Sequence, residues 1–306
     1  SRIVKIARRT GVDVAYMGDG VNDAVALHAA DVGISVDSAT DIAKDAADIV
    51  LLDKDLGVLA DGVMEGRRIF ANTLKYVLMA TSSNFGNMFS AAGASLFLTF
   101  LPMLPSQILL NNLLYDVGQL AIPTDNVDEE VLARPAAWDI AFVRRFMSVF
   151  GPISSIFDFI TFFVMLVILD ASHAEFRSGW FVESLATQTL VVFVIRTRRV
   201  PFFRSQPSRA MIITPIACAV VGAALPFSPI ADTLGFTTLP ISFFLILVGM
   251  IITYLALVEI AKSRFYAAQV HPRRAPLSHE ERHQRHVARR AARYRRHTLR
   301  TRPRAS

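Results

Sequence analysis

The sequence predicts a short α/β portion followed by an all-α bundle of six transmembrane helices. Of its 306 residues, 53% are hydrophobic and only 19% are charged, and the mean hydropathy is +0.41. Long apolar stretches after residue 75 suit helices that cross a membrane, whereas residues 1–55 alternate short apolar runs with alanine-rich helical patterns. This composition excludes a disordered protein and argues against a purely soluble enzyme.

The first part of the chain has the pattern of a parallel α/β domain. We expect strands at Val12–Met17, Val32–Val36 and Ile49–Leu52, and helices at Ile3–Arg9, Asn22–Ala30 and Ser38–Ala47. Ser38 is a suitable N-cap for the last of these helices. Strands that alternate with short helices indicate a parallel sheet, and so few strands indicate the end of a larger domain.

A long helix is expected to connect the two parts. The pattern over Leu56–Tyr76 is helical and continues without a helix breaker into the first apolar stretch. We therefore predict a stalk helix at residues 56–75 that joins the α/β part rigidly to the membrane part.

Six apolar stretches predict the transmembrane helices of residues 76–261. They lie near Tyr76–Leu101, Leu104–Pro123, Phe146–Leu169, Trp180–Ile195, Met211–Phe227 and Leu239–Ile260. The fourth stretch is short, and polar residues and Gly118 interrupt the second. Arginines crowd the link at residues 196–209, whereas the loops of the opposite side carry only Arg177. Because cytoplasmic loops are enriched in Lys and Arg, we expect both termini and the α/β part to be cytoplasmic at the plasma (inner) membrane.

The C-terminal segment, residues 262–306, is a basic tail. It holds 14 of the 32 Lys and Arg residues but only 2 of the 26 Asp and Glu residues. Contact with anionic lipids of the inner leaflet and a solvated, disordered tail are equally good interpretations. A metal site at His279 and His283 is weaker, and with Tyr294 as the one interleaved aromatic residue we expect no nucleic acid partner. The lone Cys218 allows no disulfide within the chain.

The first chemical motif runs from Gly18 to Leu27. Gly18 and Gly20 allow a tight turn and a close approach to an anion, and the following helix start offers free N–H groups for phosphate. Asp19 ends the strand and Asp23 lies in the first helical turn, so both carboxylates can point to one place. Two carboxylates beside a phosphate are the usual way to hold Mg²⁺, and the neutral Asn22 can hydrogen-bond a phosphoryl oxygen without repelling it.

Polar residues inside the first two apolar stretches form the second motif. Asn84 and Asn87 share one helical face, as do Asn112 and Asp116. A charged residue in a membrane costs several kcal/mol, about 2.5–3.5 on insertion scales, and normally faces a protein interior or an ion path. We predict that these four residues bind a transported cation, and that Gly118 marks local unwinding of the second stretch.

Other polar residues of the membrane part have simpler interpretations. Interhelical hydrogen bonding explains Asn84 or Asn111, taken alone, as well as cation binding does. Asp158 lies mid-span, and we expect a neighbouring helix to satisfy it, with an ion ligand or relay as the weaker choice. Glu183 lies close to a span end, and we expect it to be solvated.

The motif Gly18–Leu27 resembles the hinge motif of P-type ATPases, within their haloacid-dehalogenase-like phosphorylation domain. The segments Ala29–Val36, Ala43–Leu51 and Glu65–Asn72 resemble the same family, and the likeness covers about residues 1–265. It implies that Asp19 and Asp23 bind the catalytic Mg²⁺ and that Asn22 contacts the phosphoryl group.

The family's phosphorylated motif, Asp-Lys-Thr-Gly-Thr, does not occur in this sequence. The resemblance therefore implies the C-terminal portion of a pump whose phosphorylated Asp and nucleotide-binding domain lie upstream. The start at Ser1 fits a fragment, which we expect to be inactive alone, with ATP as the substrate of the complete pump.

Residues Leu110–Asp125 closely resemble the magnesium-importing subfamily. Calcium pumps typically have Asn-Val-Gly-Glu in the preceding span, where this sequence has Asn84-Phe85-Gly86-Asn87. The missing glutamate removes one negative charge and argues against a calcium site, whereas Mg²⁺ keeps much of its water and needs few charged ligands. The alternatives are a pump for Ca²⁺ or a monovalent cation, a non-catalytic membrane remnant that binds lipid or a partner, and, more weakly, a stand-alone phosphatase.

Overall fold

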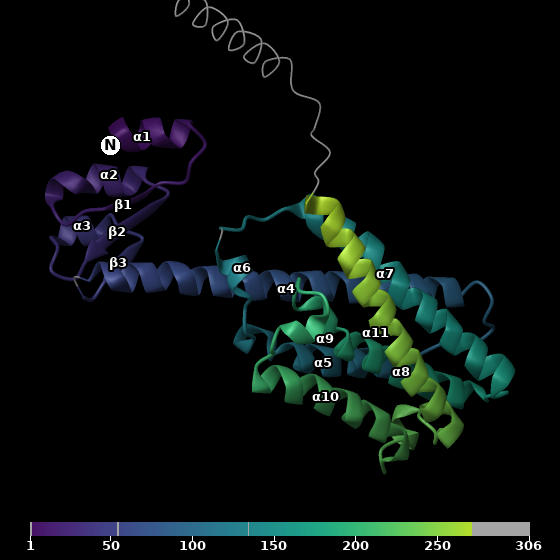
Figure 1. Cartoon of the computed structure of the whole chain (residues 1–306). Helices are drawn as coiled ribbons and strands as arrows, with labels where there is room; N and C mark the ends of the chain where they lie inside the picture. Colours follow the sequence, from purple (N-terminus) through teal and green to yellow (C-terminus); the bar gives the residue numbers. More distant parts are fainter. Residues whose placement is uncertain (1, 54, 134, 271–306) are drawn as a thin grey trace, which may run out of the picture.

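The structure is a computed structural model that describes residues 2–53, 55–133 and 135–270. One long helix, α4, carries a small α/β part at its beginning and enters a helical bundle with its second half (Figure 1). The predicted order of an α/β part, a stalk and an all-α part is confirmed. The predicted basic tail lies outside the described residues from residue 271 onward.

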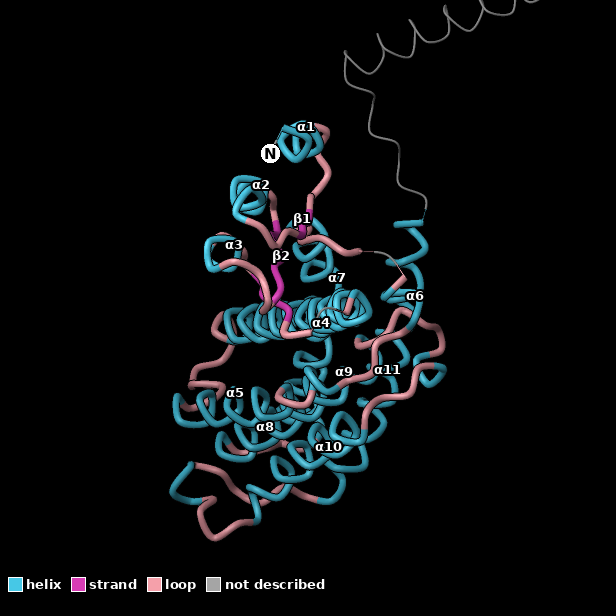
Figure 2. Tube along the Cα trace, turned by 90° about the vertical axis from the view of Figure 1, so that its left-hand side faces the viewer, coloured by secondary structure: helices cyan, strands magenta, loops and turns pink. Residues whose placement is uncertain are grey.

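The α/β part contains a three-stranded parallel sheet in the order β1-β2-β3. Its elements are α1 (Arg2–Arg9), β1 (Ala15–Met17), η1 (Val21–Asp23), α2 (Ala24–Ala29), β2 (Val32–Val36), α3 (Asp41–Asp45) and β3 (Ile49–Leu51). Tyr16 pairs with Gly33, and Ser35 pairs with Val50. Both crossover helices, α2 and α3, lie on one face of the sheet (Figure 2), as right-handed connections between neighbouring parallel strands require.

Helix α3 starts later than predicted. Its N-cap is Thr40, whose hydroxyl accepts a hydrogen bond from the Ala43 N–H, rather than Ser38. Leu27 and Ala43 are fully buried and form a small core with Val36 and Ala39. This core is thin, because three short strands and two short helices enclose few apolar side chains.

Helix α4 spans Leu56–Ala94, 39 residues without interruption. Asp55 caps it by accepting a hydrogen bond from the Gly57 N–H at 2.7 Å. The predicted continuity of the stalk and the first apolar stretch is therefore confirmed. Because an α-helix rises about 1.5 Å per residue, such a helix is a rigid mechanical link between the α/β part and the bundle.

Four helical segments of the described chain are long and apolar enough to cross a membrane. They are Ile140–Ile168 (α7, Ile140–Phe163, with η3, Val164–Ile168), His173–Ile195 (α8, His173–Leu190, with α9, Val192–Ile195), Arg209–Phe227 (α10, Arg209–Ala224, with η5, Leu225–Phe227) and Ile241–Ala267 in α11 (Ile241–Val270). The predicted fourth span is thus longer than expected, because the seven residues before Trp180 are also helical.

The second predicted span is shorter than expected. Helix α5 covers Pro105–Gln119, 15 residues, and the 3₁₀ turn η2 (Ile122–Thr124) follows it. At 1.5 Å per residue it is about 22 Å long, less than the roughly 30 Å of a hydrocarbon core. Gly118 is still helical and packs near Thr189 and Cys218, so regular helix ends only after Gln119.

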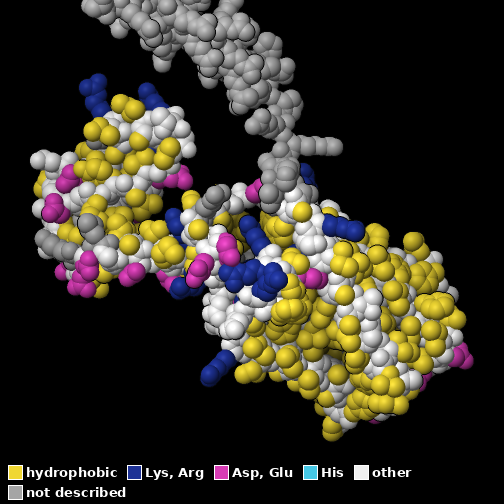
Figure 3. Space-filling view, in the orientation of Figure 1, with side chains coloured by type: hydrophobic (Ala, Val, Ile, Leu, Met, Phe, Trp, Pro, Cys, Tyr) yellow, Lys and Arg dark blue, Asp and Glu magenta, His cyan; other side chains and the backbone are white. Residues whose placement is uncertain are grey.

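Helix α8 lies at the centre of the bundle. Its apolar window is 89% buried, against 28% for those of α10 and α11, and it packs on α5, α7, α10 and α11. Helix α4 packs chiefly along α7. The outer surface of the bundle is largely hydrophobic, while basic side chains gather where α4 enters it (Figure 3). This division suits a bundle that sits in lipid with its stalk end in water.

Two connecting segments close the stalk end of the bundle. One joins α5 to α7 and contains α6 (Glu129–Leu132), and the other joins α9 to α10 and contains η4 (Phe202–Arg204). At the other end of the bundle, η6 (Asp232–Leu234) lies in the loop between α10 and α11. Asp125 accepts hydrogen bonds from Lys75 of α4 and from Arg196 after α9. Burial lowers the pKa of Lys75, and the nearby Asp125 carboxylate opposes this effect. The stalk is therefore tied to both segments through one buried carboxylate.

Candidate functional site

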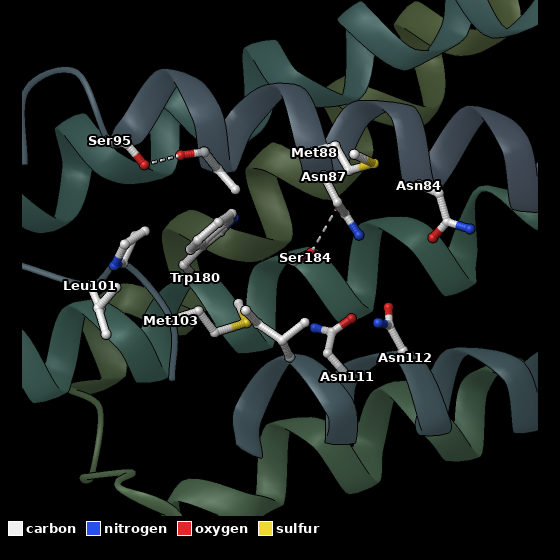
Figure 4. A pocket seen from close by; sticks show the side chains of 13 residues that line it. Asn84, Asn87, Met88, Ser95, Leu101, Met103, Asn111, Asn112, Trp180 and Ser184 are labelled. Carbon is white, nitrogen blue, oxygen red and sulfur yellow. Dashed lines mark hydrogen bonds between the residues drawn. The ribbon is translucent and has the colours of Figure 1, made fainter. Parts of the chain in front are cut away.

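A cavity of about 560 Å³ lies between α4, α5 and α8 (Figure 4). It reaches Ser95 and Met103, just beyond the end of α4, and so lies in the half of the bundle that is remote from the stalk. It is lined by Asn84, Asn87, Met88, Ala91, Ser95, Leu101, Pro102, Met103, Ile108, Asn111, Asn112, Trp180 and Ser184. The lining contains four asparagine amides and two serine hydroxyls but no charged side chain. The cavity is therefore uncharged, and its polar groups are neutral amides and hydroxyls set among apolar side chains.

Three of the four residues predicted to bind the transported cation line this cavity. Asn84 and Asn87 come from α4, and Asn112 comes from α5 on the opposite wall (Figure 4). The Ser184 hydroxyl of α8 donates to the Asn87 side-chain oxygen at 3.5 Å. Helical spacing explains the arrangement, because residues three apart on α4 project toward the same neighbour.

Asn111 makes the interhelical hydrogen bonds that were one of its two interpretations. It lines the cavity, yet its side-chain amide donates to the Phe181 carbonyl at 3.4 Å and its oxygen accepts from Gln188 at 3.5 Å. These bonds hold α5 against α8. Asn111 thus holds the wall of the cavity in place. Its side-chain oxygen already accepts a hydrogen bond, so it is less available to a ligand than that of Asn112.

Asp116 lies apart from the three asparagines. It lines a second cavity of about 510 Å³, together with Asn72, Tyr76 and Gln119, closer to the stalk. One helical turn separates it from Asn112, so the two residues share a face of α5 as predicted, but they border different cavities. The four predicted ligands are therefore divided, because Asn84, Asn87 and Asn112 border one cavity and Asp116 borders the other.

Helix α8 contributes to the cavity, which the sequence did not predict. Ser184 and Trp180 line the cavity, and Gln188 donates to Ser184 and Asn111. The signal was present as polar residues at four-residue spacing inside an apolar stretch. It was missed because the predicted span began at Trp180, which placed Ser184 near a membrane surface.

The two acidic residues of α7 and α8 are both buried. Asp158 accepts hydrogen bonds from Ser90 at 2.6 Å and from the Trp180 indole at 2.8 Å, so the prediction that neighbouring helices satisfy it is confirmed. Glu183 is 1% exposed, and the prediction of a solvated side chain is wrong. Helix α8 begins at His173, seven residues before the predicted start, so Glu183 lies inside the bundle.

The predicted phosphate motif lies at the carboxyl end of β1. The Gly18 N–H donates to the Ile34 carbonyl, the Ser35 hydroxyl donates to the Gly18 carbonyl, and the Thr40 N–H donates to the Asp19 carbonyl. These bonds fix the backbone at the sheet edge. The side chains of Asp19 and Asn22 are exposed there, as a site for an external phosphate requires.

Asp23 is held more tightly than Asp19. Its Oδ1 accepts from the Tyr16 hydroxyl at 2.7 Å, and its Oδ2 accepts from the Gly20 N–H at 3.2 Å. The hydrogen bond from Tyr16, helped by that from Gly20, lowers the pKa of Asp23, and the same bond raises the pKa of Tyr16. Asp23 is therefore an oriented carboxylate that stays ionised at neutral pH.

Gly18 allows this arrangement by close approach. A Cβ atom placed on Gly18 would lie 2.4 Å from the Asp23 Cβ and 2.7 Å from its Cγ, distances that no side chain tolerates. Gly20 has more space, because its nearest contact would be the Asp23 Oδ2 at 3.5 Å. The first glycine of the motif is thus required sterically, and the second supplies an N–H to Asp23.

The residues at this edge fit a catalytic Mg²⁺. The Asp19 carboxylate takes no hydrogen bond from the described residues, and each Asp23 oxygen keeps one lone-pair direction beyond its single donor. Mg²⁺ is commonly held by one or two carboxylates together with substrate phosphates. Within the described residues no group of three or more His, Cys, Asp or Glu side chains forms a metal site.

The chain is similar to known proteins over most of its length. Residues 100–264 match the family model "Cation transporting ATPase, C-terminus". The chain is 54% identical over 270 residues to "Magnesium-transporting ATPase, P-type 1" of Escherichia coli (strain K12), and 53% identical to the protein of that name from Salmonella typhimurium (strain LT2). Each match covers 87% of this chain and 30% of the relative, so the chain spans about 30% of their length.

A more distant relative carries a different cation in its name. The "Calcium-transporting ATPase" of Bacillus subtilis is 37% identical over 135 residues, which cover 44% of this chain and 15% of that protein. Because the family model covers more than half of the sequence, the chain belongs to the cation-transporting P-type ATPases and contains their C-terminal region.

Proposed function

We propose that this chain is the C-terminal part of an ATP-driven pump that imports Mg²⁺ into the cytoplasm. The observation that carries the proposal is the uncharged cavity between α4, α5 and α8, where asparagine and serine side chains lie among apolar ones, with the acidic Asp116 in the neighbouring cavity. Amide and hydroxyl oxygens can bind a cation that retains part of its water shell, as Mg²⁺ does. The names and identities of the bacterial relatives support the same cation.

In this proposal, Asn84, Asn87 and Asn112 receive the transported Mg²⁺ in the neutral cavity. The carboxylate of Asp116, which borders the second cavity, supplies the negative charge that attracts this Mg²⁺. Placing an ionised carboxylate in contact with lipid costs free energy. We therefore expect Asp116 to face water or protein. The two cavities adjoin the same face of α5, so a cation that passes between them moves along that face.

Helix α4 is the proposed link between chemistry and transport. It runs from the end of the α/β part to Asn84 and Asn87 without a break. A displacement of the α/β part during phosphorylation would therefore move both asparagines relative to α5. Since ligand distances decide cation affinity, such a movement changes the affinity of the cavity.

The α/β part is proposed to be the end of a haloacid-dehalogenase-like phosphorylation domain. There Asp19 and Asp23 hold the catalytic Mg²⁺, and Asn22 hydrogen-bonds the phosphoryl group of an aspartate that lies outside this sequence. When bound, the Mg²⁺ neutralises phosphate charge. Tyr16, Gly18 and Gly20 position the carboxylate of Asp23 for that task.

The remaining parts of the proposal concern the membrane. We place six transmembrane helices in the chain, with α4 and α5 as the first two, and both termini on the cytoplasmic side of the plasma membrane. The basic tail, which lies outside the described residues, is assigned to anionic lipids of the inner leaflet.

The test is ATP-driven ²⁸Mg²⁺ uptake by the complete pump in proteoliposomes. We expect Asp116→Asn to reduce uptake at least tenfold at limiting Mg²⁺, and Leu113→Ala, an exposed neighbour that lines neither cavity, to leave it unchanged. Uptake of Ca²⁺ or of monovalent cations in place of Mg²⁺ would refute the choice of cation. The absence of any ATP-dependent cation uptake would refute the pump and favour a non-catalytic role.

A further inference from the structure

Asp158 and Glu183 form a buried acidic pair that the proposed transport site does not use. Asp158 lies on α7 and is 2% exposed, and Glu183 lies on α8 and is 1% exposed. Trp180, whose indole N–H binds Asp158, is one helical turn before Glu183 on α8. This hydrogen bond brings Asp158 against the part of α8 that carries Glu183.

The surroundings of the two carboxyl groups differ. Asp158 has a donor on each oxygen, since Trp180 binds Oδ1 and Ser90 binds Oδ2. Neither carboxyl oxygen of Glu183 has a hydrogen-bond partner among the described residues. The nearby hydroxyls of Thr161 and Thr187 donate elsewhere, to the Met250 sulfur and to the carbonyls of Glu183 and Ser184.

No cation compensates the pair within the described part of the chain. Neither carboxyl group takes part in a salt bridge with a described Lys, Arg or His. The groups that face the acidic pair are Ser90 from α4, Thr161 from α7, Trp180 and Thr187 from α8, and the titratable Tyr254 from α11. Two adjacent carboxylates in such a site cannot both be ionised.

The pair lies directly behind the wall of the cation cavity. Trp180 lines that cavity and donates its N–H to Asp158. Ser184, the residue after Glu183, also lines it and binds Asn87. A charge in the cavity is therefore separated from the pair by one layer of side chains in a medium that screens it weakly.

We propose that Asp158 and Glu183 are a proton-binding site, with the proton on Glu183 and the negative charge on Asp158. Two donors stabilise the carboxylate of Asp158, whereas Glu183 lacks any donor and is cheaper to bury as the neutral acid. Resting on the proposed function, we further infer that a divalent cation in the adjoining cavity expels this proton. The site takes a proton as its ligand and, without any covalent step, releases it to water in the adjoining cavity.

The experiment is infrared difference spectroscopy of the full-length protein in lipid at about pH 8, where ordinary carboxyl groups are ionised. The readout is the C=O stretch of a protonated carboxyl group, identified by its shift in D₂O. We expect this band in the native protein, its loss in Glu183→Gln and its survival in Asp158→Asn. Asp232→Asn, an exposed carboxylate in the loop before α11, is the matched control and should leave the band unchanged.

Addition of Mg²⁺ tests the coupling in the same sample. We expect the band to lose at least half of its intensity, and we expect Asn112→Ala to weaken this response. A missing band in the native protein, or a band that persists in Glu183→Gln, would overturn the proton site. A band that ignores Mg²⁺, Ca²⁺ and monovalent cations alike would overturn the coupling. Because none of these readouts uses ATP or turnover, failure of the proton site is distinguishable from failure of the pump.

Discussion

The guanidinium of Arg196 donates through Nε to both carboxylate oxygens of Asp125, at 3.0 and 2.8 Å, and both side chains are buried. The same guanidinium binds the carbonyls of Ser205, Asn126 and Gln206. One side chain thereby joins the segment after α5 to the segment before α10. Lys75 extends the contact to the stalk helix, so this cluster fixes where α4 enters the bundle.

We predict that Arg196→Met destabilises the bundle strongly. Removing one partner of a buried ion pair typically costs about 3–5 kcal/mol, because the other charge is left without compensation. The measurement is the denaturant midpoint of the purified protein in detergent. Arg204→Met, at an exposed arginine of the same segment, is the control. Equal midpoints for the two variants would show that the cluster contributes no net stability.

Gly18→Ala should disturb the phosphate motif. The added Cβ would lie 2.4 Å from the Asp23 Cβ, so the turn must shift and Asp23 must leave Tyr16. We expect faster hydrogen exchange over residues 15–29, measured by mass spectrometry. Gly62→Ala, in the stalk where a Cβ meets nothing within 4 Å, should instead stabilise its helix by up to about 1 kcal/mol. Unchanged exchange in Gly18→Ala would contradict the steric argument.

Tyr16→Phe should raise the pKa of Asp23 toward its ordinary value. The Tyr16 hydrogen bond is the largest cause that lowers this pKa, and phenylalanine cannot donate it. A carboxyl group whose pKa is lower in the folded state contributes stability above its unfolded pKa, near 3.8, and loses it as the pH falls through the folded value. The variant should therefore lose part of this contribution at neutral pH and show a weaker acid dependence.

Carboxyl ¹³C chemical shifts of labelled aspartate, followed between about pH 6 and pH 2, measure this change. Val25→Ala, at an exposed position of α2 away from the carboxylate, should leave the Asp23 titration where it is. A Tyr16→Phe titration that coincides with the native one would mean that the Gly20 N–H alone sets the acidity of Asp23.

Asn112→Ala should weaken the apparent affinity for Mg²⁺ in the complete pump. Hydrogen bonds to charged partners contribute roughly 1.5–3 kcal/mol, which corresponds to a rise of at least about tenfold in half-saturating Mg²⁺. Leu113→Ala, on the adjacent exposed position of α5, controls for general damage. The measurement is the rate of ATP hydrolysis at increasing concentrations of free Mg²⁺, with the MgATP concentration held constant. A lower maximal rate with unchanged half-saturation would place Asn112 outside the cation site.

Local sequence patterns predicted much of the fold. The strand at Val32–Val36 is confirmed at both of its ends, and the strand before Gly18 and the parallel sheet are confirmed as well. Such elements depend on neighbours in the sequence, through side-chain alternation and turn residues. The predicted helix boundaries were less accurate where two nearby residues can each serve as the N-cap, as Ser38 and Thr40 can for α3.

The candidate sites were predicted only in part, because ligands converge from helices that are distant in sequence. The spacing of Asn84 and Asn87 placed them on one face of one helix, and the cavity confirms that they share a wall. No spacing rule could show that Ser184 completes that wall or that Asp116 faces a different cavity. The first fact depends on how α8 packs against α4 and α5, and the second on how α5 packs against α4.

The sequence by itself determined the class of the protein and the continuity of the stalk, because each depends on short-range patterns. Only the tertiary structure decided which polar side chains meet inside the bundle. Asp158 and Glu183 are 25 positions apart on different helices, and their encounter follows from helix packing. The sequence suggested that Glu183 lies in water, whereas the packing of α7 and α8 buries it close to Asp158.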